Sequence, residues 1–262
     1  MQSIKGVIKA MNEEFKEILI KSTMDGSLEP SLFYESEEKG KRPLLVFLHT
    51  WSHGRANQAK RLGYAKKRGF HMLLPEFRGS NTLSNPRIVE ACASKLAKQD
   101  IKDAIDYCIE HYEVDTDNIF VIGLSGGGHM SLMMAGEWPE LFRAVTAFVP
   151  ITDLDLWREQ SVGYRKHLDA IAEGGRETLA ERSPVSYIDN IARANVKIFA
   201  GKYDKVVPFR QTLDFYNTVL EKHPEARIFV DIFDGGHEYC EELADEWITS
   251  QLGAKKNTEV TG

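Results

Sequence analysis

The stretch NIFVIGLSGGGHMSLMMAG, residues 118–136, decides the fold of this chain. Its first seven residues form an apolar run that is typical of a strand buried on both faces of a parallel sheet. A helical pattern begins at Gly126 and reaches about residue 137. Between strand and helix lies Gly123-Leu124-Ser125-Gly126-Gly127, which is a G-x-S-x-G turn. This order predicts a serine at the tip of a sharp bend.

Such a bend gives Ser125 the features of a nucleophile. The turn holds its central residue at strained backbone angles, and small neighbours are needed so that nothing collides. The Ser125 hydroxyl would then project above the sheet edge, at the positive end of the following helix. The backbone N–H of Gly126 would be free to face a developing oxyanion. The alternative is a glycine-rich turn that only packs a helix against a sheet.

A histidine downstream of Ser125 is the first requirement, because a serine hydroxyl is a poor nucleophile without a base. Four of the eight histidines precede Ser125, and three others lie in the helix after the turn, in the segment 151–190 or at the end of a helix. His237 is left, in a Gly-Gly loop between the last apolar run and the last predicted helix. We therefore predict His237 as the general base, against the alternative of a surface or core histidine.

The acid is expected after the preceding strand, which is the run KIFAG (197–201). Asp204 comes three residues later and could hold the Nδ1–H of His237 and stabilise its imidazolium form. Asp214 and Asp231 are weaker candidates for the acid, because Asp214 falls in a predicted helix and Asp231 inside a predicted strand. A loop-capping aspartate is the alternative interpretation of Asp204.

A second oxyanion donor is expected in the loop after the first buried strand, where the sequence reads His49-Thr50-Trp51. Residues that follow such a histidine commonly lend a backbone N–H to the oxyanion hole. We predict Trp51 as this donor, with Thr50 second, beside Gly126. The indole of Trp51 is also expected to line the pocket that binds the acyl group of the substrate.

Further apolar runs and helical patterns alternate along the chain, which predicts βαβ units and an α/β fold with a mostly parallel sheet. The first 40 residues hold shorter β-like runs separated by turns, as antiparallel hairpins would be. Strands are predicted at 4–8, 15–21, 31–34, 44–50, 70–76, 118–124, 144–150, 197–201 and 227–233, and helices at 57–68, 91–111, 126–137, 209–222 and 238–252.

The segment 151–190 interrupts this alternation, since it is rich in charge and glycine. We expect a small cap-like insertion over the carboxyl ends of the strands, where open α/β sheets bind ligands. Trp157 in this segment and His129 after the turn are candidate substrate-binding residues. The chain is predicted to form a single domain over 1–252 and a polar tail over 253–262.

Composition excludes several classes of protein. The chain has 262 residues, of which 42% are hydrophobic and 27% charged, too apolar for a disordered chain and too poor in glycine for collagen. A net charge of -6 disfavours nucleic acid or anionic membrane as the main partner, because both need a basic patch. No apolar run is long enough to span a bilayer, and no signal peptide is recognisable.

Cofactors are not expected from the motifs. The sequence contains no HExxH, P-loop or GxGxxG pattern, and the pair His49 and His53 lacks a helix and further ligands, so neither a metal nor an organic cofactor is predicted. Three cysteines without CxxC spacing, Cys92, Cys108 and Cys240, are interpreted as free thiols of a reducing compartment. A cytoplasmic location is the corresponding expectation.

With these residues in place, the chain resembles the α/β-hydrolase superfamily. It is most similar to the catalytic domain of the prolyl oligopeptidase-like (S9) serine peptidases and their esterase relatives. The resemblance covers about 43–252, and its markers are PEFRGSN (75–81), the stretch from DAIDYC through the G-x-S-x-G turn to ITDL (103–154), SPVSYIDNI (183–191), GKYDKVVP (201–208) and DGGHEY (234–239).

This resemblance implies an α/β-hydrolase fold with Ser125 as nucleophile, His237 as base and Asp204 as orienting acid. Gly126 and the 50–51 loop would form the oxyanion hole. The chain departs from the family at two points: the usual His-Gly after the first core strand reads His49-Thr50, and Gly128-His129 stands where the family often carries a tyrosine.

The predicted reaction is acyl transfer to water through an acyl-enzyme, on a small ester or a short peptide. Three functions stay open: a carboxylesterase for small soluble esters, a prolyl oligopeptidase-like peptidase, and a binding protein that has lost catalysis. We rank the esterase first, because only about 40 residues precede residue 43. They are too few for the propeller domain that controls the access of peptides to the site in large oligopeptidases. The sequence leaves the oligomeric state open.

Overall fold

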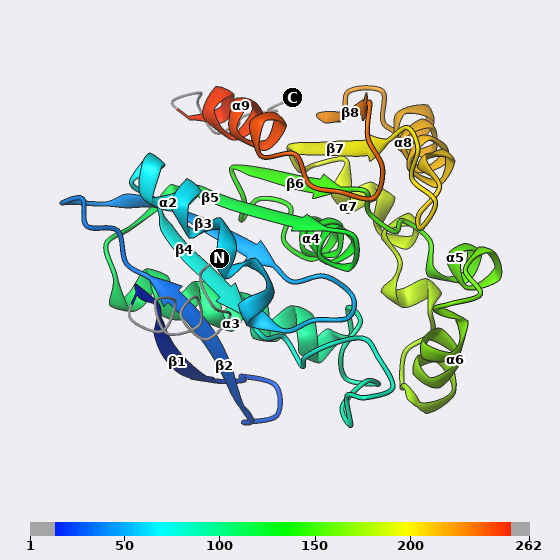
Figure 1. Ribbon diagram of the computed structural model, residues 1–262, viewed down its shortest axis with the longest axis horizontal. Coiled ribbons are helices and arrows are strands. Elements are labelled where there is room, and N and C mark those ends of the chain that lie inside the picture. The colour runs from blue at the N-terminus through cyan, green and yellow to red at the C-terminus, as the bar shows by residue number, and fades with distance from the viewer. Residues whose placement is uncertain (1–13, 253–262) are drawn as a thin grey trace, which may run out of the picture.

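The computed structural model describes residues 14–252, and its centre is an eight-stranded sheet in the order β1-β2-β4-β3-β5-β6-β7-β8 (Figure 1). The β1–β2 and β2–β4 pairs are antiparallel, and all other pairs are parallel. This arrangement confirms the predicted α/β-hydrolase fold with antiparallel N-terminal strands. The strands are β1 (Lys16–Lys21), β2 (Leu28–Tyr34), β3 (Arg42–Leu48), β4 (His71–Pro75), β5 (Val114–Leu124), β6 (Ala144–Phe148), β7 (Val196–Gly201) and β8 (Ile228–Phe233).

Helices cover both faces of the sheet. Residues of α3, α4, α7 and α8 pack into one buried cluster with β3, while residues of α2 and α9 pack into a second cluster on the other face. The α-helices are α2 (Leu62–Arg68), α3 (Lys95–His111), α4 (Gly126–Glu137), α5 (Leu154–Gln160), α6 (Arg165–Gly174), α7 (Ile188–Ile191), α8 (Phe209–Lys222) and α9 (Glu241–Gln251), with 3₁₀ turns at Arg55–Arg61, Ala180–Arg182 and Pro184–Tyr187.

Strand β3 is buried on both faces, as its apolar run predicts. Leu44, Val46 and Leu48 belong to the first cluster, and Leu45 and Phe47 belong to the second. Successive side chains of a strand point to opposite faces, so a continuous apolar run supplies both cores at once.

Most predicted elements match the structure within a few residues, and the start of α3 is a clear exception. The helix predicted from residue 91 begins at Lys95, because Cys92 and Ala93 lie at positive φ, 47° and 54°. The hydroxyl of Ser94 then caps the helix by accepting a hydrogen bond from the N–H of Ala97 at 3.0 Å.

The boundaries of other predicted segments also differ. Strand β5 begins at Val114 rather than at residue 118, with a shift of register against β3, and α9 begins at Glu241 rather than at residue 238. The predicted strand at 4–8 and the tail at 253–262 lie outside the described residues.

Arg78, in the PEFRGSN marker, ties the antiparallel hairpin to the rest of the fold. Its buried guanidinium donates to the carboxylates of Asp100 in α3, at 2.5 and 3.0 Å, and of Asp25 between β1 and β2, at 2.7 and 3.1 Å. The hydrogen bond from Arg78 holds the pKa of Asp25 well below its usual range. This network joins three segments that are distant in sequence.

The segment 151–190 forms a helical insertion. Figure 1 shows α5 and α6 beside the end of the sheet toward which the parallel strands point. Its apolar side chains form a third buried cluster, separate from the two that flank the sheet. The insertion therefore lies at the edge where the functional residues were predicted.

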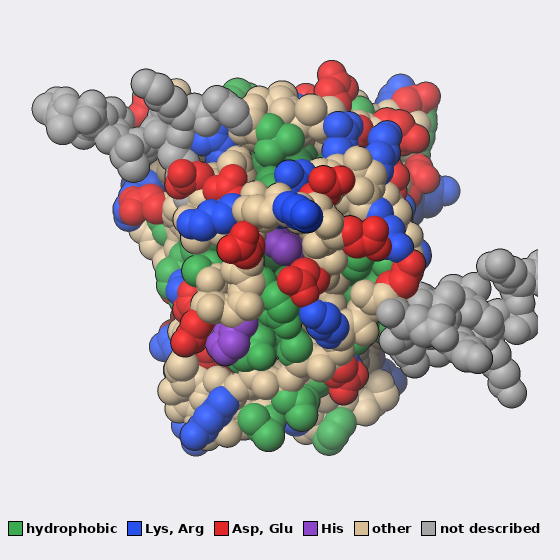
Figure 2. Space-filling view, turned by 90° about the vertical axis from the view of Figure 1, so that its left-hand side faces the viewer, with side chains coloured by type: hydrophobic (Ala, Val, Ile, Leu, Met, Phe, Trp, Pro, Cys, Tyr) green, Lys and Arg blue, Asp and Glu red, His purple; other side chains and the backbone are tan. Residues whose placement is uncertain are grey.

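The surface carries both signs of charge. On the face shown in Figure 2, acidic and basic side chains are interspersed, and neither sign covers a continuous area. Within residues 14–252, no helix combines the length and the apolar character needed to cross a bilayer.

Candidate active site

Ser125 lies between β5 and α4 in the strained turn that the sequence predicts. Its backbone angles are φ 58° and ψ -118°, outside the usual regions for a residue with a side chain. The neighbouring glycines are required by contact: a Cβ on Gly127 would lie 2.5 Å from the carbonyl oxygen of Leu48, and one on Gly123 would collide with the carbonyl of Gly127. Ser125 is 8% exposed.

The loop after β3 packs directly against the start of α4. A Cβ on Gly126 would lie 2.6 Å from the backbone nitrogen of Trp51, so the two main chains are in contact. An N–H in the first turn of a helix has no intrahelical partner, and within the described residues the N–H of Trp51 donates no hydrogen bond either. The N–H of Thr50 is engaged with Oδ1 of Asn57 at 3.3 Å.

Asp204 and His237 lie together at the ends of β7 and β8. The Nδ1 atom of His237 is 2.7 Å from Oδ2 of Asp204, whose side chain is completely buried. Oδ1 of Asp204 accepts hydrogen bonds from the N–H groups of Val206 at 2.8 Å and Val207 at 2.9 Å. Three donors therefore surround the buried carboxylate, and the imidazole is held in one orientation.

Main-chain contacts fix the loop that carries His237. The N–H of Tyr203 donates to the carbonyl of Gly235 at 2.9 Å, and the N–H of Gly236 donates to the Glu238 carboxylate at 2.9 Å. A Cβ on Gly201 would collide with the carbonyl of Gly236. Glycine at position 201 is thus needed for the close approach of the two loops.

Ser125, Asp204 and His237 all follow the carboxyl ends of parallel strands, so the fold brings them to one edge of the sheet. The hydroxyl of Ser125 makes no hydrogen bond with His237 among the described residues. In unliganded sites, hydrogen bonds of this kind are often long and tighten only when substrate binds.

Trp157 and His129, the two predicted substrate-binding residues, are each 1% exposed. Nε2 of His129 is 2.7 Å from the carbonyl of Arg182 in the insertion, and burial lowers the pKa of His129 to about 4. The indole N–H of Trp157 donates to the carbonyl of Val206 at 3.0 Å. Burial of both rings speaks against direct contact with substrate.

Several residues that order the loop after β3 were not found from the sequence. The carboxylate of Glu76 accepts from the N–H of Arg55 at 3.1 Å and covers Gly54 so closely that no Cβ fits there. The ring of His49 stacks on Phe77 with centroids 3.8 Å apart, and burial lowers its pKa. The marker PEFRGSN contains Glu76 and Phe77, but no spacing rule connects them to this loop.

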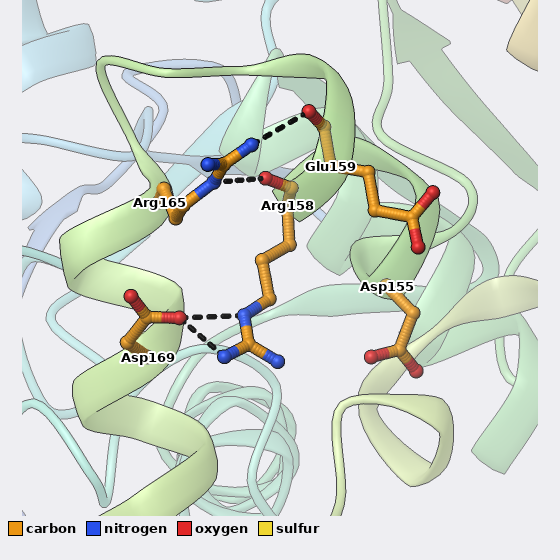
Figure 3. A pocket seen from close by; sticks show the side chains of 5 residues that line it. All are labelled: Asp155, Arg158, Glu159, Arg165 and Asp169. Carbon is orange, nitrogen blue, oxygen red and sulfur yellow. Dashed lines mark hydrogen bonds and ion pairs between the residues drawn. The ribbon is translucent and has the colours of Figure 1, made fainter.

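Two surface hollows of the described residues were not predicted from the sequence. One, of about 320 Å³, opens on the outer face of the insertion between α5 and α6 (Figure 3) and is lined by Asp155, Arg158, Glu159, Arg165 and Asp169. The other, of about 580 Å³, adjoins the loop after β3 and is lined by Glu17, Leu32, His53, Gly54, Arg55, Ala56, Asn57 and Glu76.

The described part of the chain shows neither a metal-binding cluster nor a disulfide. Residues 14–252 contain no group of three His, Cys, Asp or Glu side chains placed to hold a metal ion. Cys92, Cys108 and Cys240 are free thiols, as predicted, and the first two are buried.

The profile of the prolyl oligopeptidase family matches residues 57–251. Among curated proteins, the acylamino-acid-releasing enzyme of Mus musculus is 27% identical over 218 residues, covering 78% of this chain and 29% of that protein. The enzyme of the same name from Homo sapiens is 25% identical over 208 residues, covering 74% and 28%. The chain spans less than a third of the length of these relatives.

Solved structures show the same fold. An acylaminoacyl peptidase of Pyrococcus horikoshii superposes with a TM-score of 0.74 at 20% identity, covering 100% of this chain and 45% of that one. An S-formylglutathione hydrolase of Staphylococcus aureus superposes with a TM-score of 0.68 at 15% identity, covering 91% and 98%.

Proposed function

Because the chain belongs to the prolyl oligopeptidase family of serine hydrolases, we propose that it is a peptidase that cleaves short or N-acylated peptides through an acyl-enzyme. The peptidase was the alternative to a carboxylesterase in the sequence analysis, and the comparisons favour it. Relatives that match over three quarters of this chain are named acylamino-acid-releasing enzymes. The length of chain before residue 43, on which the esterase ranking rested, does not bear on the chemistry of the site.

The observation that carries the serine-hydrolase mechanism of the proposal is the 2.7 Å contact between Nδ1 of His237 and Oδ2 of Asp204. A buried carboxylate on Nδ1 places the proton there, which leaves Nε2 of His237 to accept the proton of a nucleophile. The strained serine at the same sheet edge is the nucleophile that such a base would serve.

In the proposed reaction, Oγ of Ser125 attacks the substrate carbonyl while Nε2 of His237 takes its proton. The oxyanion forms against the backbone N–H groups of Gly126 and Trp51, and Thr50 is less suited because its N–H is already engaged. His237 then protonates the leaving amine, and water repeats the sequence to release the acid. Asp204 orients the imidazole throughout.

A fluorophosphonate probe and a substrate panel test the proposal. We expect the probe to label the wild-type protein and not Ser125→Ala, while Ser84→Ala, an exposed control, labels normally. N-acetylated and free-amine peptide p-nitroanilides are compared with p-nitrophenyl acetate. We expect turnover of at least one peptide class, with a loss on the order of 10⁴-fold or more in Ser125→Ala and His237→Ala, and no further loss in the double variant.

Two results would contradict the proposal in different ways. Turnover of esters alone would restore the carboxylesterase. Absence of both labelling and turnover in the wild-type protein would favour a binding protein with a hydrolase fold.

A further inference from the structure

The third buried cluster connects the insertion with the loop that carries the proposed oxyanion donor and with the loop that carries Asp204. It contains Trp51 from the oxyanion loop (residues 50–51), Trp157 from α5 and Val207 from the acid loop (residues 202–208). The other members of the cluster come from the insertion and from the segment before α3: Ile88, Cys92, Ile151, Leu154, Leu168, Ile171 and Leu179. One apolar unit therefore touches the oxyanion loop and the acid loop at once.

Packing alone holds the ring of Trp51. The ring meets Trp157 edge-on, with centroids 4.9 Å apart and planes at 70°, and it meets Tyr164 at 6.1 Å. Its buried indole N–H has no hydrogen-bond partner among the described residues. The aromatic side chains of the insertion thus contact the residue whose backbone N–H is the proposed oxyanion donor, and the carbonyl of Trp51 accepts a hydrogen bond from the N–H of Asn81 at 2.8 Å.

A single peptide unit links Trp157 to the acid. The carbonyl of Val206 accepts from the indole N–H of Trp157 at 3.0 Å, and the N–H of Val207, in the same planar unit, donates to Oδ1 of Asp204 at 2.9 Å. Oδ2 of Asp204 lies 2.7 Å from Nδ1 of His237. A chain of hydrogen bonds runs from Trp157 to the imidazole, and each bond in such a chain polarises the next.

The outer face of the insertion keeps Trp157 in place. Figure 3 shows Arg158, the next residue after Trp157, bound to Asp169 of α6: Nε of Arg158 donates to Oδ1 of Asp169 at 2.6 Å, and Nη2 lies 2.5 Å from the same oxygen. Arg165, the next residue after Tyr164, donates to the main-chain carbonyls of Arg158 at 3.2 Å and Glu159 at 3.0 Å. The rings of Trp157 and Tyr164 pack into the third buried cluster, while Arg158 and Arg165 join α5 to α6 on the outer side.

We propose that Trp157 is a positioning residue that sets the oxyanion loop and the acid loop relative to each other without touching substrate. This inference rests on the proposed function and replaces the substrate contact that the sequence analysis predicted for Trp157. It deepens the proposed reaction by assigning the insertion to the orientation of Trp51 and Asp204.

Two substitutions distinguish the two contacts of Trp157, which are the ring packing against Trp51 and the hydrogen bond to the carbonyl of Val206. Trp157→Phe keeps an aromatic ring against Trp51 and removes the hydrogen bond to Val206, and Trp157→Leu removes both. On the substrate that the wild-type protein turns over best, we expect kcat to fall about 10-fold in Trp157→Phe and about 100-fold in Trp157→Leu, with KM within about twofold, because a misplacement of about 1 Å costs rate rather than affinity. If Trp157→Leu does not fold, Trp157→Phe alone still decides.

The control is Phe70→Leu, which alters a buried aromatic residue at the amino end of β4, on the opposite edge of the sheet from the site. All proteins are assayed well below their unfolding temperatures, and we expect kcat of this control to stay within about twofold of the wild-type value. A raised KM with unchanged kcat in Trp157→Phe would mean that Trp157 contacts substrate, and unchanged kcat and KM in Trp157→Phe would mean that it positions nothing. Either result overturns the inference while leaving the Ser125→Ala test of the proposed function intact.

Discussion

The turn at Ser125 and the insertion at 151–190 hold their functional groups by different means. Around Ser125 the main chain itself is the support: a positive φ of 58° and glycines whose missing Cβ atoms leave room for carbonyl groups. In the insertion the supports are long side chains, namely those of Trp157, Arg182 and Arg158, which donate to Val206, to Ala91 and to Asp169. Closely packed main chain leaves almost no room for an added atom. A support made by one long side chain is instead lost when the donor groups of that side chain are removed. Four substitutions would break or sharpen this contrast.

Removing the buried guanidinium of Arg182 is expected to have the largest effect. Its nitrogens donate to the carbonyls of Ala91, Cys92 and Val89, with distances from 2.8 to 3.3 Å. In Arg182→Met these buried acceptors lose a charged donor, so we expect a loss of about 4 kcal/mol in the free energy of unfolding, measured in urea. Arg193→Met, at an exposed arginine, should change it by less than about 0.5 kcal/mol. A loss below 1 kcal/mol for Arg182→Met would show that other contacts hold the insertion.

His129 links α4 to the insertion, and its effect depends on pH. Burial, with the charges of Lys98 and Arg182, lowers its pKa from 6.5 to about 4 in the folded protein. As pH falls through 6.5 the unfolded chain gains a proton that the folded protein does not, so stability is lost between about pH 6.5 and pH 4, by about 3 kcal/mol in total. This contribution is fully present above pH 6.5.

His129→Gln keeps a donor for the Arg182 carbonyl and does not titrate. We expect its unfolding free energy, followed by denaturant titration from pH 7.5 to 4, to fall about 3 kcal/mol less than that of the wild-type protein. Parallel curves for the two proteins would contradict burial of a neutral imidazole at this position.

A small addition at Gly127 tests the main-chain support. Its Cβ would lie 2.5 Å from the carbonyl oxygen of Leu48, the last residue of β3, and 2.8 Å from that of His49, the next residue, so the main chain there would have to shift. We expect Gly127→Ala to lower the unfolding free energy by about 2 kcal/mol, and to reduce fluorophosphonate labelling of Ser125. Gly63→Ala, in α2 with open space around the new Cβ, should gain up to about 1 kcal/mol instead.

Relief of strain at Ser125 gives the smallest effect, with the opposite sign. Glycine adopts the observed backbone angles freely, so Ser125→Gly should gain about 1 kcal/mol in stability, after the cost of a more flexible unfolded chain. The same variant should lose hydrolysis to the same extent as Ser125→Ala. Ser131→Gly, at helical angles in α4, should lose stability, and thermal unfolding of both variants measures the contrast. Equal losses in the two variants would mean that Ser125 is not strained.

The contrast also explains what the sequence could predict. Helices 126–137 and 209–222 match the structure to the residue, because a strict turn or a long apolar pattern marks their ends. Ser125, Asp204 and His237 could be proposed because parallel strands bring their carboxyl ends to one edge. These features depend on local pattern and chain order.

Features that depend on contacts distant in sequence could not be predicted. The bond from Trp157 to Val206 spans 49 residues, and the bond from Arg182 to Ala91 spans 91. Cys92 and Ala93 adopt positive φ although neither residue type favours it, because the surrounding structure imposes it. The helices α5 and α6 are short, so their tertiary partners rather than their own sequence determine them.

The order of strands in the sheet has a consequence for biosynthesis. Strands β5, β6, β7 and β8 are neighbours in the sheet in the order in which the ribosome makes them. Ser125 follows the first of these strands and His237 the last, so the turn that holds Ser125 is synthesised well before the loop that holds His237, the proposed base. If each strand joins the sheet edge as it emerges, the proposed site becomes competent only when the loop after β8 closes on β7. The nascent polypeptide would then carry no hydrolytic activity while its sheet is still being assembled.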